Sequence, residues 1–164
     1  MEFNFILNGK DVSVNCRPDA RVSSILREHF SLLRVKNGCT SGQCGSCSII
    51  YNNTLVSSCL LPAFTLKNCE IMTDEGFVEL KERSEIIKVL KRLEVDLCDY
   101  CKPSRLLSIH HFLMNGPQNR VSTEAEILDA LSGTKCTCTD PWSLVEVVQE
   151  CQSNKFRWQH VIRK

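Results

Sequence analysis

The stretch Cys39-Thr40-Ser41-Gly42-Gln43-Cys44-Gly45-Ser46-Cys47 carries three cysteines, and a fourth follows at Cys59. Four residues separate the first two cysteines and two separate the next pair, which is the ligand spacing of plant-type 2Fe–2S clusters. A zinc site usually uses pairs of cysteines rather than three placed so close together. The spacing therefore favours an iron–sulfur cluster on Cys39, Cys44, Cys47 and Cys59, with a zinc site or structural thiols as the alternatives.

Glycines flank and interrupt these cysteines. We expect Gly38, Gly42 and Gly45 to adopt positive φ, so that a short loop can wrap around an inorganic core without side-chain clashes. Such a loop can also direct backbone N–H groups at the cluster sulfurs and stabilise their negative charge. The sequence therefore predicts a cluster-binding loop rather than a regular element in this region.

The overall composition is that of an ordinary globular protein. The chain has 164 residues, enough for one domain or two small ones, with 43% hydrophobic and 24% charged residues. The formal net charge of +1 gives no basic field, which argues against a nucleic acid or an anionic membrane surface as partner. No apolar run approaches the length of a membrane-spanning helix.

Cysteine is the unusual component, with eleven residues in the chain. An odd number, behind an amino terminus that lacks the basic and apolar regions of a secretory signal, does not indicate a disulfide framework. We therefore expect a cytoplasmic protein whose thiolates are held by metal. Outside the cluster motifs, we expect Cys16, Cys69 and Cys151 to be buried structural thiols.

The first half of the chain, residues 1–76, alternates short strand patterns with helical ones. Asn8-Gly9 and Asn52-Asn53 are expected to be the turns of two hairpins. The expected elements are strands at 3–7 and 12–16, a helix at 20–30, strands at 48–51 and 54–56, a short helical segment at 60–66, a strand at 70–73 and a turn at 74–76. This is a small α+β unit of ferredoxin size.

Strand patterns disappear in residues 77–164, where helical periodicity predicts helices at 78–93, 104–114, 124–131 and 142–151. Pro103 suits a first helical position, and Asp140-Pro141 suits a cap followed by a first residue. Thr123 and Glu126 form a capping-box pattern, and Gly133 is expected to close that helix. Four short-linked helices predict a bundle, with residues 152–164 as a tail that orders only against a partner.

The helical half has cysteine pairs of its own, Cys98 with Cys101 and Cys136 with Cys138. Both pairs fall on expected loops at helix ends, which a bundle can bring together. A single C-x2-C pair is a weak signal, because it also occurs in redox dithiols and in zinc sites.

Taken in order, the eight cysteines resemble the pattern of the iron–sulfur subunit of the molybdenum hydroxylases, the xanthine dehydrogenase and aldehyde oxidase family. The resemblance covers residues 3–151 and includes residues 35–49, Ser58-Cys59-Leu60 and Thr73-Asp74-Glu75-Gly76. Eight cysteines in this order and spacing are a specific signature.

The resemblance implies a ferredoxin-like β-grasp domain at 1–76 followed by a helical four-helix-bundle domain at 77–164. It implies one 2Fe–2S cluster on Cys39, Cys44, Cys47 and Cys59, and a second on Cys98, Cys101, Cys136 and Cys138. In such complexes electrons pass from a molybdopterin-binding large subunit, which hydroxylates a purine, aldehyde or N-heterocycle, through both clusters to an FAD-binding medium subunit. The chain is then part of an oxidoreductase but carries no substrate site.

Residues around the second set depart from the family pattern. The family usually has Gln where this chain has Leu97, and Cys-Gly-Phe-Cys-Thr-Pro-Gly where it has Cys98-Asp99-Tyr100-Cys101-Lys102-Pro103-Ser104. It usually has Cys-Arg-Cys-Thr-Gly-Tyr in place of Cys136-Thr137-Cys138-Thr139-Asp140-Pro141. The resemblance is therefore to a divergent member of the family, in which the ligands are kept and their neighbours differ. A stand-alone ferredoxin-like carrier and a zinc-binding structural module are the alternative interpretations.

Overall fold

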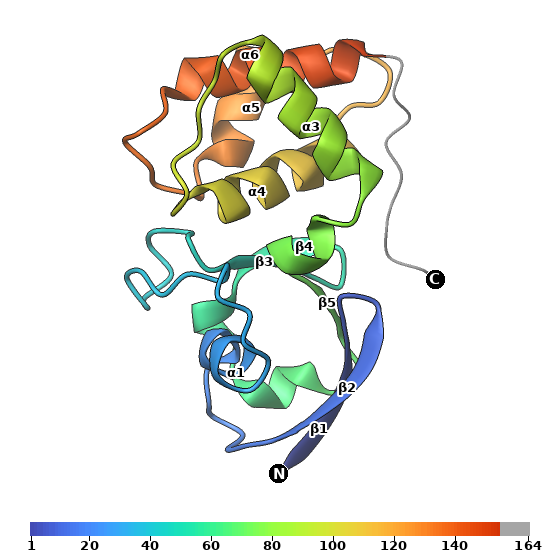
Figure 1. The fold of residues 1–164 in the computed structure, drawn as a ribbon, viewed down its shortest axis with the longest axis vertical. Helices are drawn as coiled ribbons and strands as arrows, with labels where there is room; N and C mark the ends of the chain where they lie inside the picture. Colours follow the sequence, from blue (N-terminus) through green and yellow to red (C-terminus); the bar gives the residue numbers. More distant parts are fainter. Residues whose placement is uncertain (155–164) are drawn as a thin grey trace.

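A five-stranded sheet forms much of the first half of the chain in the computed structural model, which describes residues 1–154 (Figure 1). The strands are β1 (Glu2–Leu7), β2 (Lys10–Asn15), β3 (Ser48–Tyr51), β4 (Thr54–Ser57) and β5 (Glu70–Met72). Their order in the sheet is β2-β1-β5-β3-β4, with β1 and β5 parallel and the other neighbours antiparallel.

Both predicted hairpin turns are confirmed. Asn8 and Gly9 have φ of 51° and 76°, and Asn52 and Asn53 have φ of 45° and 66°. Two consecutive left-handed residues are typical of the tight turns that match the twist of antiparallel strands, and asparagine tolerates this conformation better than most residues.

One face of the sheet is covered by α1 (Val22–Glu28) and by two short 3-10 helices, η1 (Ser58–Leu60) and η2 (Ala63–Leu66). Phe3, Phe5 and Ile49 of the sheet pack there against Ile25 and Leu26 of α1 in one hydrophobic core. Helix α1 is shorter than the helix predicted at 20–30. The short helical segment predicted at 60–66 is divided between η1 and η2.

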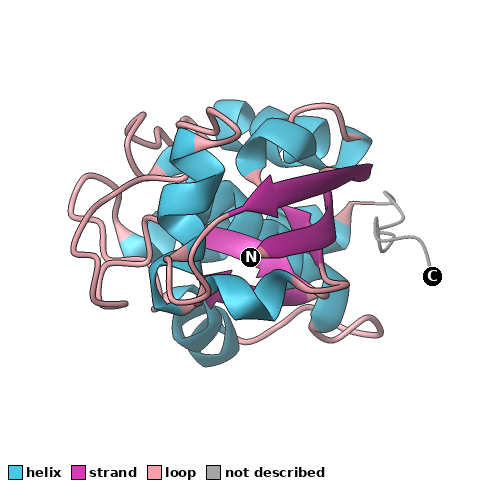
Figure 2. Ribbon diagram, turned by 90° about the horizontal axis from the view of Figure 1, so that it is seen from below, coloured by secondary structure: helices cyan, strands magenta, loops and turns pink. Residues whose placement is uncertain are grey.

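The remaining helices lie together on the side of the sheet where β3 and β4 contact α4, above these strands in Figure 1 (Figures 1 and 2). They are α2 (Asp74–Phe77), α3 (Lys81–Arg92), α4 (Lys102–Asn115), α5 (Glu124–Leu131) and α6 (Pro141–Ser153). The central helix is α4, which contacts α2, α3, α5, α6 and β3. The helices form a second hydrophobic core. Ile50 and Met72 of the sheet belong to it, whereas Ile49 belongs to the first core, against α1. Strand β3 thus turns successive side chains into two different cores, as strand geometry requires.

The turn predicted at residues 74–76 is wrong, because these residues form the first part of α2. The acidic side chains of Asp74 and Glu75 lie in its first turn, where they favour a helix N-terminus. The buried Asp74 carboxylate accepts hydrogen bonds from Arg34 at 2.7 Å and from Arg83 at 3.2 Å. These ion pairs fasten the junction between the sheet and α3.

The predicted caps of α5 and α6 are confirmed. Thr123 Oγ1 accepts from the Glu126 N–H at 3.4 Å, and the Glu126 carboxylate accepts from the Thr123 N–H at 2.8 Å. Asp140 accepts from the Ser143 N–H at 3.0 Å. Helix α6 continues through Ser153, so the start of the predicted tail at 152–153 is helical instead, and the tail from residue 155, with Trp158, lies outside the described residues. Within residues 1–154, no helix is long and apolar enough to cross a membrane.

Candidate metal centres

The first four cysteines lie in the loop before β3 and just beyond β4. Cys47 immediately precedes β3, and Cys59 lies in η1 directly after β4. The β3–β4 hairpin brings them together, since the Ser58 hydroxyl donates to the Cys47 carbonyl oxygen at 2.7 Å. Cys47 and Cys59 are buried, whereas Cys39 and Cys44 are partly exposed on the loop.

Backbone N–H groups converge on the loop sulfurs. The N–H groups of Ser41, Gln43 and Cys44 donate to Cys39 Sγ at 3.4, 3.2 and 3.3 Å, and the Cys39 N–H donates to Cys44 Sγ at 3.4 Å. Hydrogen bonds from Ser41 and Cys44 lower the pKa of Cys39 to about 6, so its thiolate is favoured at neutral pH. This is the environment that an anionic thiolate ligand requires.

In the buried pair, Cys47 and Cys59, the pKa of Cys59 is shifted in the opposite direction. Burial, together with the neighbouring Cys47, raises the pKa of Cys59 to about 11. Two adjacent buried sulfurs ionise together only when a cation offsets their charge. The donor chemistry of this group therefore fits a metal centre.

Two of the three glycine predictions are confirmed and one is wrong. Gly42 and Gly45 have φ of +78° and +68°, but φ at Gly38 is not positive. Gly38 is required for space instead, because a Cβ there would lie 2.7 Å from Cys44 Sγ and from Ser46 Oγ.

The second set lies at helix ends, as predicted. Cys98 and Cys101 precede α4, with Cys101 as its N-cap, and Cys136 lies in the loop between α5 and α6. The sulfurs of these three cysteines all lie within 4.8 Å of one another, and Cys98 Sγ is 4.0 Å from Cys136 Sγ. Burial and the neighbouring Cys136 and Cys98 raise the pKa of Cys101 to about 12.

Cys138 is exposed and falls outside this three-sulfur group. Its sulfur still interacts with Cys98 and Cys136, which raise its pKa. Among the described residues, a compact group of three sulfurs forms only in the second set. The first set is connected by pairwise contacts, of Cys39 with Cys44 and of Cys47 with Cys59.

The loops that carry the two sets touch one another. The Lys135 N–H donates to the Cys44 carbonyl oxygen at 3.0 Å, so a backbone hydrogen bond joins the first set to the residue before Cys136. A Cβ at Gly45 would lie 2.0 Å from the Gly133 carbonyl oxygen, so these backbones are in close contact. The contact thus requires glycine at position 45, whereas a Cβ at Gly133, which follows the end of α5, would meet nothing within 4 Å. Figure 1 shows the first loop beside the start of α4.

Within residues 1–154, no other thiol and no histidine joins the three-sulfur group. Cys69 and Cys151 are buried as predicted, and burial raises their pKa values to about 11 and about 12, whereas Cys16 is only half-buried. His110 is buried against Phe77, with ring centroids 4.6 Å apart.

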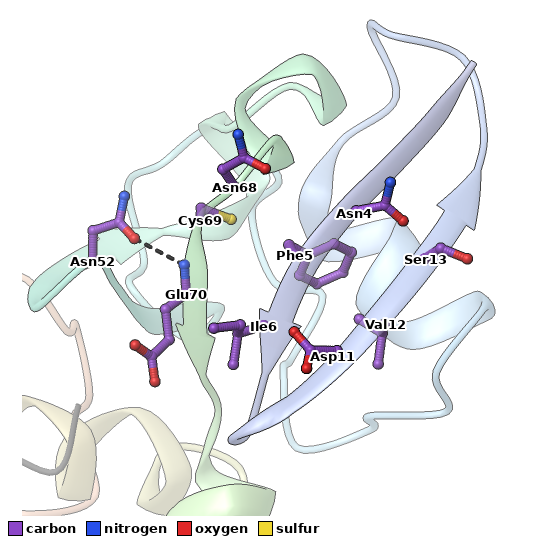
Figure 3. Close-up of a pocket in the computed structure, with 10 residues that line it drawn as sticks. All are labelled: Asn4, Phe5, Ile6, Asp11, Val12, Ser13, Asn52, Asn68, Cys69 and Glu70. Carbon is purple, nitrogen blue, oxygen red and sulfur yellow. Dashed lines mark hydrogen bonds between the residues drawn. The ribbon is translucent and has the colours of Figure 1, made fainter. Parts of the chain in front are cut away.

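A separate hollow lies along β1, β2 and the start of β5 (Figure 3). Its lining residues are Asn4, Phe5, Ile6, Asp11, Val12, Ser13, Asn52, Asn68, Cys69 and Glu70. The Asn52 side chain accepts from the Glu70 N–H at 2.8 Å across one edge. None of the eight cysteines of the two sets lines this hollow, so it is distinct from the metal centres.

Sequence reasoning did not identify one charged residue beside the second set. Arg105 lies on α4 and is only 5% exposed, and it interacts electrostatically with Cys136 and Cys101. The available signal was a single arginine within the helical stretch 103–109, whose other residues are apolar or serine, at a position that faces the core.

Two family models match the chain. A "2Fe-2S iron-sulfur cluster binding domain" matches residues 5–80, and a "[2Fe-2S] binding domain" matches residues 73–149. The first match contains Cys39, Cys44, Cys47 and Cys59, and the second contains the cysteines of the second set.

Two bacterial iron–sulfur subunits match over most of their own length. The chain is 35% identical to the nicotinate dehydrogenase small FeS subunit of Eubacterium barkeri, over 83% of this chain and 85% of that subunit. It is 30% identical to the xanthine dehydrogenase iron-sulfur-binding subunit of Escherichia coli O157:H7, over 91% and 92%. The crystal structure of quinoline 2-oxidoreductase from Pseudomonas putida 86 superposes with a TM-score of 0.82 at 26% identity, covering 93% of this chain and 92% of that one.

Proposed function

Because the chain belongs to the iron–sulfur subunits of the molybdenum hydroxylase family, we propose that it relays electrons from a molybdopterin subunit to a flavin subunit. When bound, a 2Fe–2S cluster would supply one-electron redox chemistry. The chain is one subunit of an oxidoreductase complex, and the substrate site lies on another subunit.

The proposed ligands are Cys39, Cys44, Cys47 and Cys59 for the first cluster, and Cys98, Cys101, Cys136 and Cys138 for the second. The observation that carries this assignment is the convergence of Cys98, Cys101 and Cys136, which come from two separate loops and yet have sulfurs within 4.8 Å. Cys138 is exposed, and the interaction of its sulfur with Cys98 and Cys136 supports it as the fourth ligand.

The proposed domain division is a ferredoxin-like β-grasp domain at 1–76 and a helical bundle domain at 77–164. Two hydrophobic cores support it, one between the sheet and α1 and one among the helices. The contribution of Ile50 and Met72 to the helical core gives the two domains a shared, apolar interface.

The protein residues bind, orient and shield. Thiolates hold the iron, N–H groups of the 39–44 loop stabilise charge on sulfur, and burial of Cys47, Cys59 and Cys101 limits access of water. The Lys135-to-Cys44 hydrogen bond joins the two ligand sets through a short backbone route. Eight free thiols also require an environment that keeps them reduced, which supports a cytoplasmic location.

The proposed partners are a molybdopterin-binding large subunit and an FAD-binding medium subunit. The relatives' names include xanthine, nicotinate, isoquinoline and aldehyde enzymes, so the proposed substrate class is a purine, another N-heterocycle or an aldehyde. Leu97, at the position where the family usually has Gln, packs against the helical core. The contacts of this chain with the pterin are therefore expected to differ from the usual ones at this position.

The test is anaerobic purification of the complex with Cys44→Ala, and with Cys16→Ala as a matched control outside both sets. We expect about four iron atoms per chain in the wild type and in Cys16→Ala, and about two in Cys44→Ala, since each 2Fe–2S cluster holds two. Electron paramagnetic resonance of the reduced protein should lose one of two signals in Cys44→Ala. Four irons and both signals in that variant would contradict the ligand assignment.

A further inference from the structure

Arg105 is a buried cation without a carboxylate partner. Its side chain on α4 is 5% exposed, and one guanidinium nitrogen donates to the Leu131 carbonyl oxygen at 2.8 Å. Its Nε has no hydrogen-bond partner within the described part of the chain, and no ion pair found there includes it. A buried charge without a counter-charge is strongly unfavourable.

Arg105 follows Cys101 by one turn at the start of α4, and residues four apart lie on the same face of a helix, so Arg105 is placed beside the second cysteine set. Burial lowers the pKa of Arg105, whereas the charges of Cys136 and Cys101 raise it. The Arg105 backbone N–H also donates to the Cys101 carbonyl oxygen at 2.9 Å, which fixes its helix position one turn after that cysteine. The counter-charge of Arg105 is thus the proposed ligand set of the second cluster.

Capping of α5 does not account for the charge. The bond to the Leu131 carbonyl oxygen satisfies the end of α5, but a neutral amide donor would satisfy it equally and without the cost of burying a cation. The charge itself therefore needs a second reason, and the adjacent sulfurs supply one.

We propose that Arg105 is a positioning residue that holds a fixed positive charge against the second 2Fe–2S cluster and raises its reduction potential. The proposal rests on the proposed function, through the assignment of Cys101 and Cys136 as ligands. Four thiolates and two sulfides outweigh the charge of two ferric ions, so the centre is anionic, and one-electron reduction makes it more so. A cation in a poorly solvated site stabilises the reduced state more than the oxidised state.

The experiment compares Arg105→Gln, which keeps a donor for Leu131 but removes the charge, with Arg105→Lys, which keeps the charge. Arg92→Gln is the control, because it removes a charge from an exposed ion pair with Glu150 on the same helical half. Each variant complex is assayed for iron, for thermal unfolding and for both reduction potentials by a redox titration followed by electron paramagnetic resonance. The signal that survives Cys44→Ala identifies the second cluster.

We expect Arg105→Gln to lower the potential of the second cluster by at least about 59 mV, a tenfold change in its one-electron equilibrium. The first cluster should shift less, and Arg105→Lys and Arg92→Gln should stay near the wild type. An unchanged second potential in a fully loaded Arg105→Gln would overturn the proposal and leave only the capping role. Absence of a second signal in the wild type would instead contradict the proposed function.

If Arg105→Gln fails to hold the second cluster, iron loading of Arg105→Lys and Arg105→Met decides the matter. Loading in the Lys variant but not in the Gln and Met variants supports a required charge. Equal loss of iron in all three variants overturns the proposal that the charge is required.

Discussion

At the scale of single residues, the cysteines and glycines of the 38–47 loop were predictable and their separate roles were not. The spacing of Cys39, Cys44 and Cys47 predicts the loop, and the converging N–H groups agree with it. Gly38 was expected at positive φ, but its role is to leave room for Cys44 Sγ. A glycine in a sequence indicates that a side chain is excluded at that position. It does not show whether the reason is a positive φ or a lack of space for a Cβ.

Gly45 combines both constraints, which gives a residue-scale prediction. Gly45→Ala places a side chain at φ +68° and also 2.0 Å from the Gly133 carbonyl oxygen, so the two loops must separate. Gly9→Ala is the matched control, because φ is +76° there and the space is open. We expect Gly9→Ala to destabilise the protein by about 1 kcal/mol through strain alone.

Gly45→Ala should destabilise the protein more than Gly9→Ala does, as measured by thermal unfolding. It should also lower the iron content, as measured by iron analysis. Equal destabilisation in the two variants, with iron retained, would show that the contact between the loops does not matter.

At the scale of elements, local signals succeeded where a cap or turn is decided by adjacent residues. The two asparagine-containing turns and the capping box of α5 were predicted from their residues and are present. The turn expected at 74–76 is wrong because Asp74 of α2 pairs with Arg34, 40 residues before it, and with Arg83 of α3, contacts that adjacent residues do not reveal. Helix boundaries shifted for the same reason, since packing overrides weak local preference.

The capping box supports a prediction with a pH dependence. Thr123→Ala removes the hydroxyl that caps α5 and should destabilise the protein by about 1 kcal/mol in urea unfolding. Hydrogen bonds from Arg120 and then Thr123 lower the pKa of Glu126 to about 2 from its ordinary 4.5. Because the folded pKa is depressed, the contribution of the carboxylate is complete above pH 4.5 and is lost as pH falls towards 2.

The difference between wild type and Thr123→Ala should therefore persist from pH 7 to pH 5 and shrink only below 4.5. Ser132→Ala, at the opposite end of α5, is the control and should have a smaller effect. A loss of the difference between pH 7 and pH 5 would show that another group controls this helix end.

At the scale of the whole molecule, the sequence predicted an α+β half and a helical half, but not how closely they join. Ile50 and Met72 read as ordinary strand residues, yet they complete the core of the helices. The hydrogen bond from Lys135 to Cys44 joins residues that no local pattern relates. Such contacts depend on how complete elements dock, which short-range periodicity does not encode.

Iron removal tests this arrangement as a whole. Chelation under reducing conditions should lower the melting temperature, because metal binding contributes to folding free energy. Amide hydrogen exchange should accelerate in the loops at 38–47 and 133–138, where cysteine contacts replace regular structure. Strand β1, whose partners β2 and β5 carry no ligand, serves as the internal reference. Equal acceleration across the chain would indicate that the apo protein unfolds as one unit.

The pairing of β3 with β4 places Ser48 opposite Ser57, with Cys47 just before one strand and Cys59 just after the other. A slip of one residue in this pairing would exchange the faces of the sheet that Ile49 and Ile50 occupy. It would also displace the Cys47 sulfur relative to the Cys59 sulfur. The register of this hairpin therefore decides whether the two thiols lie side by side, so a strand mispairing would be expected to lower iron content as well as stability.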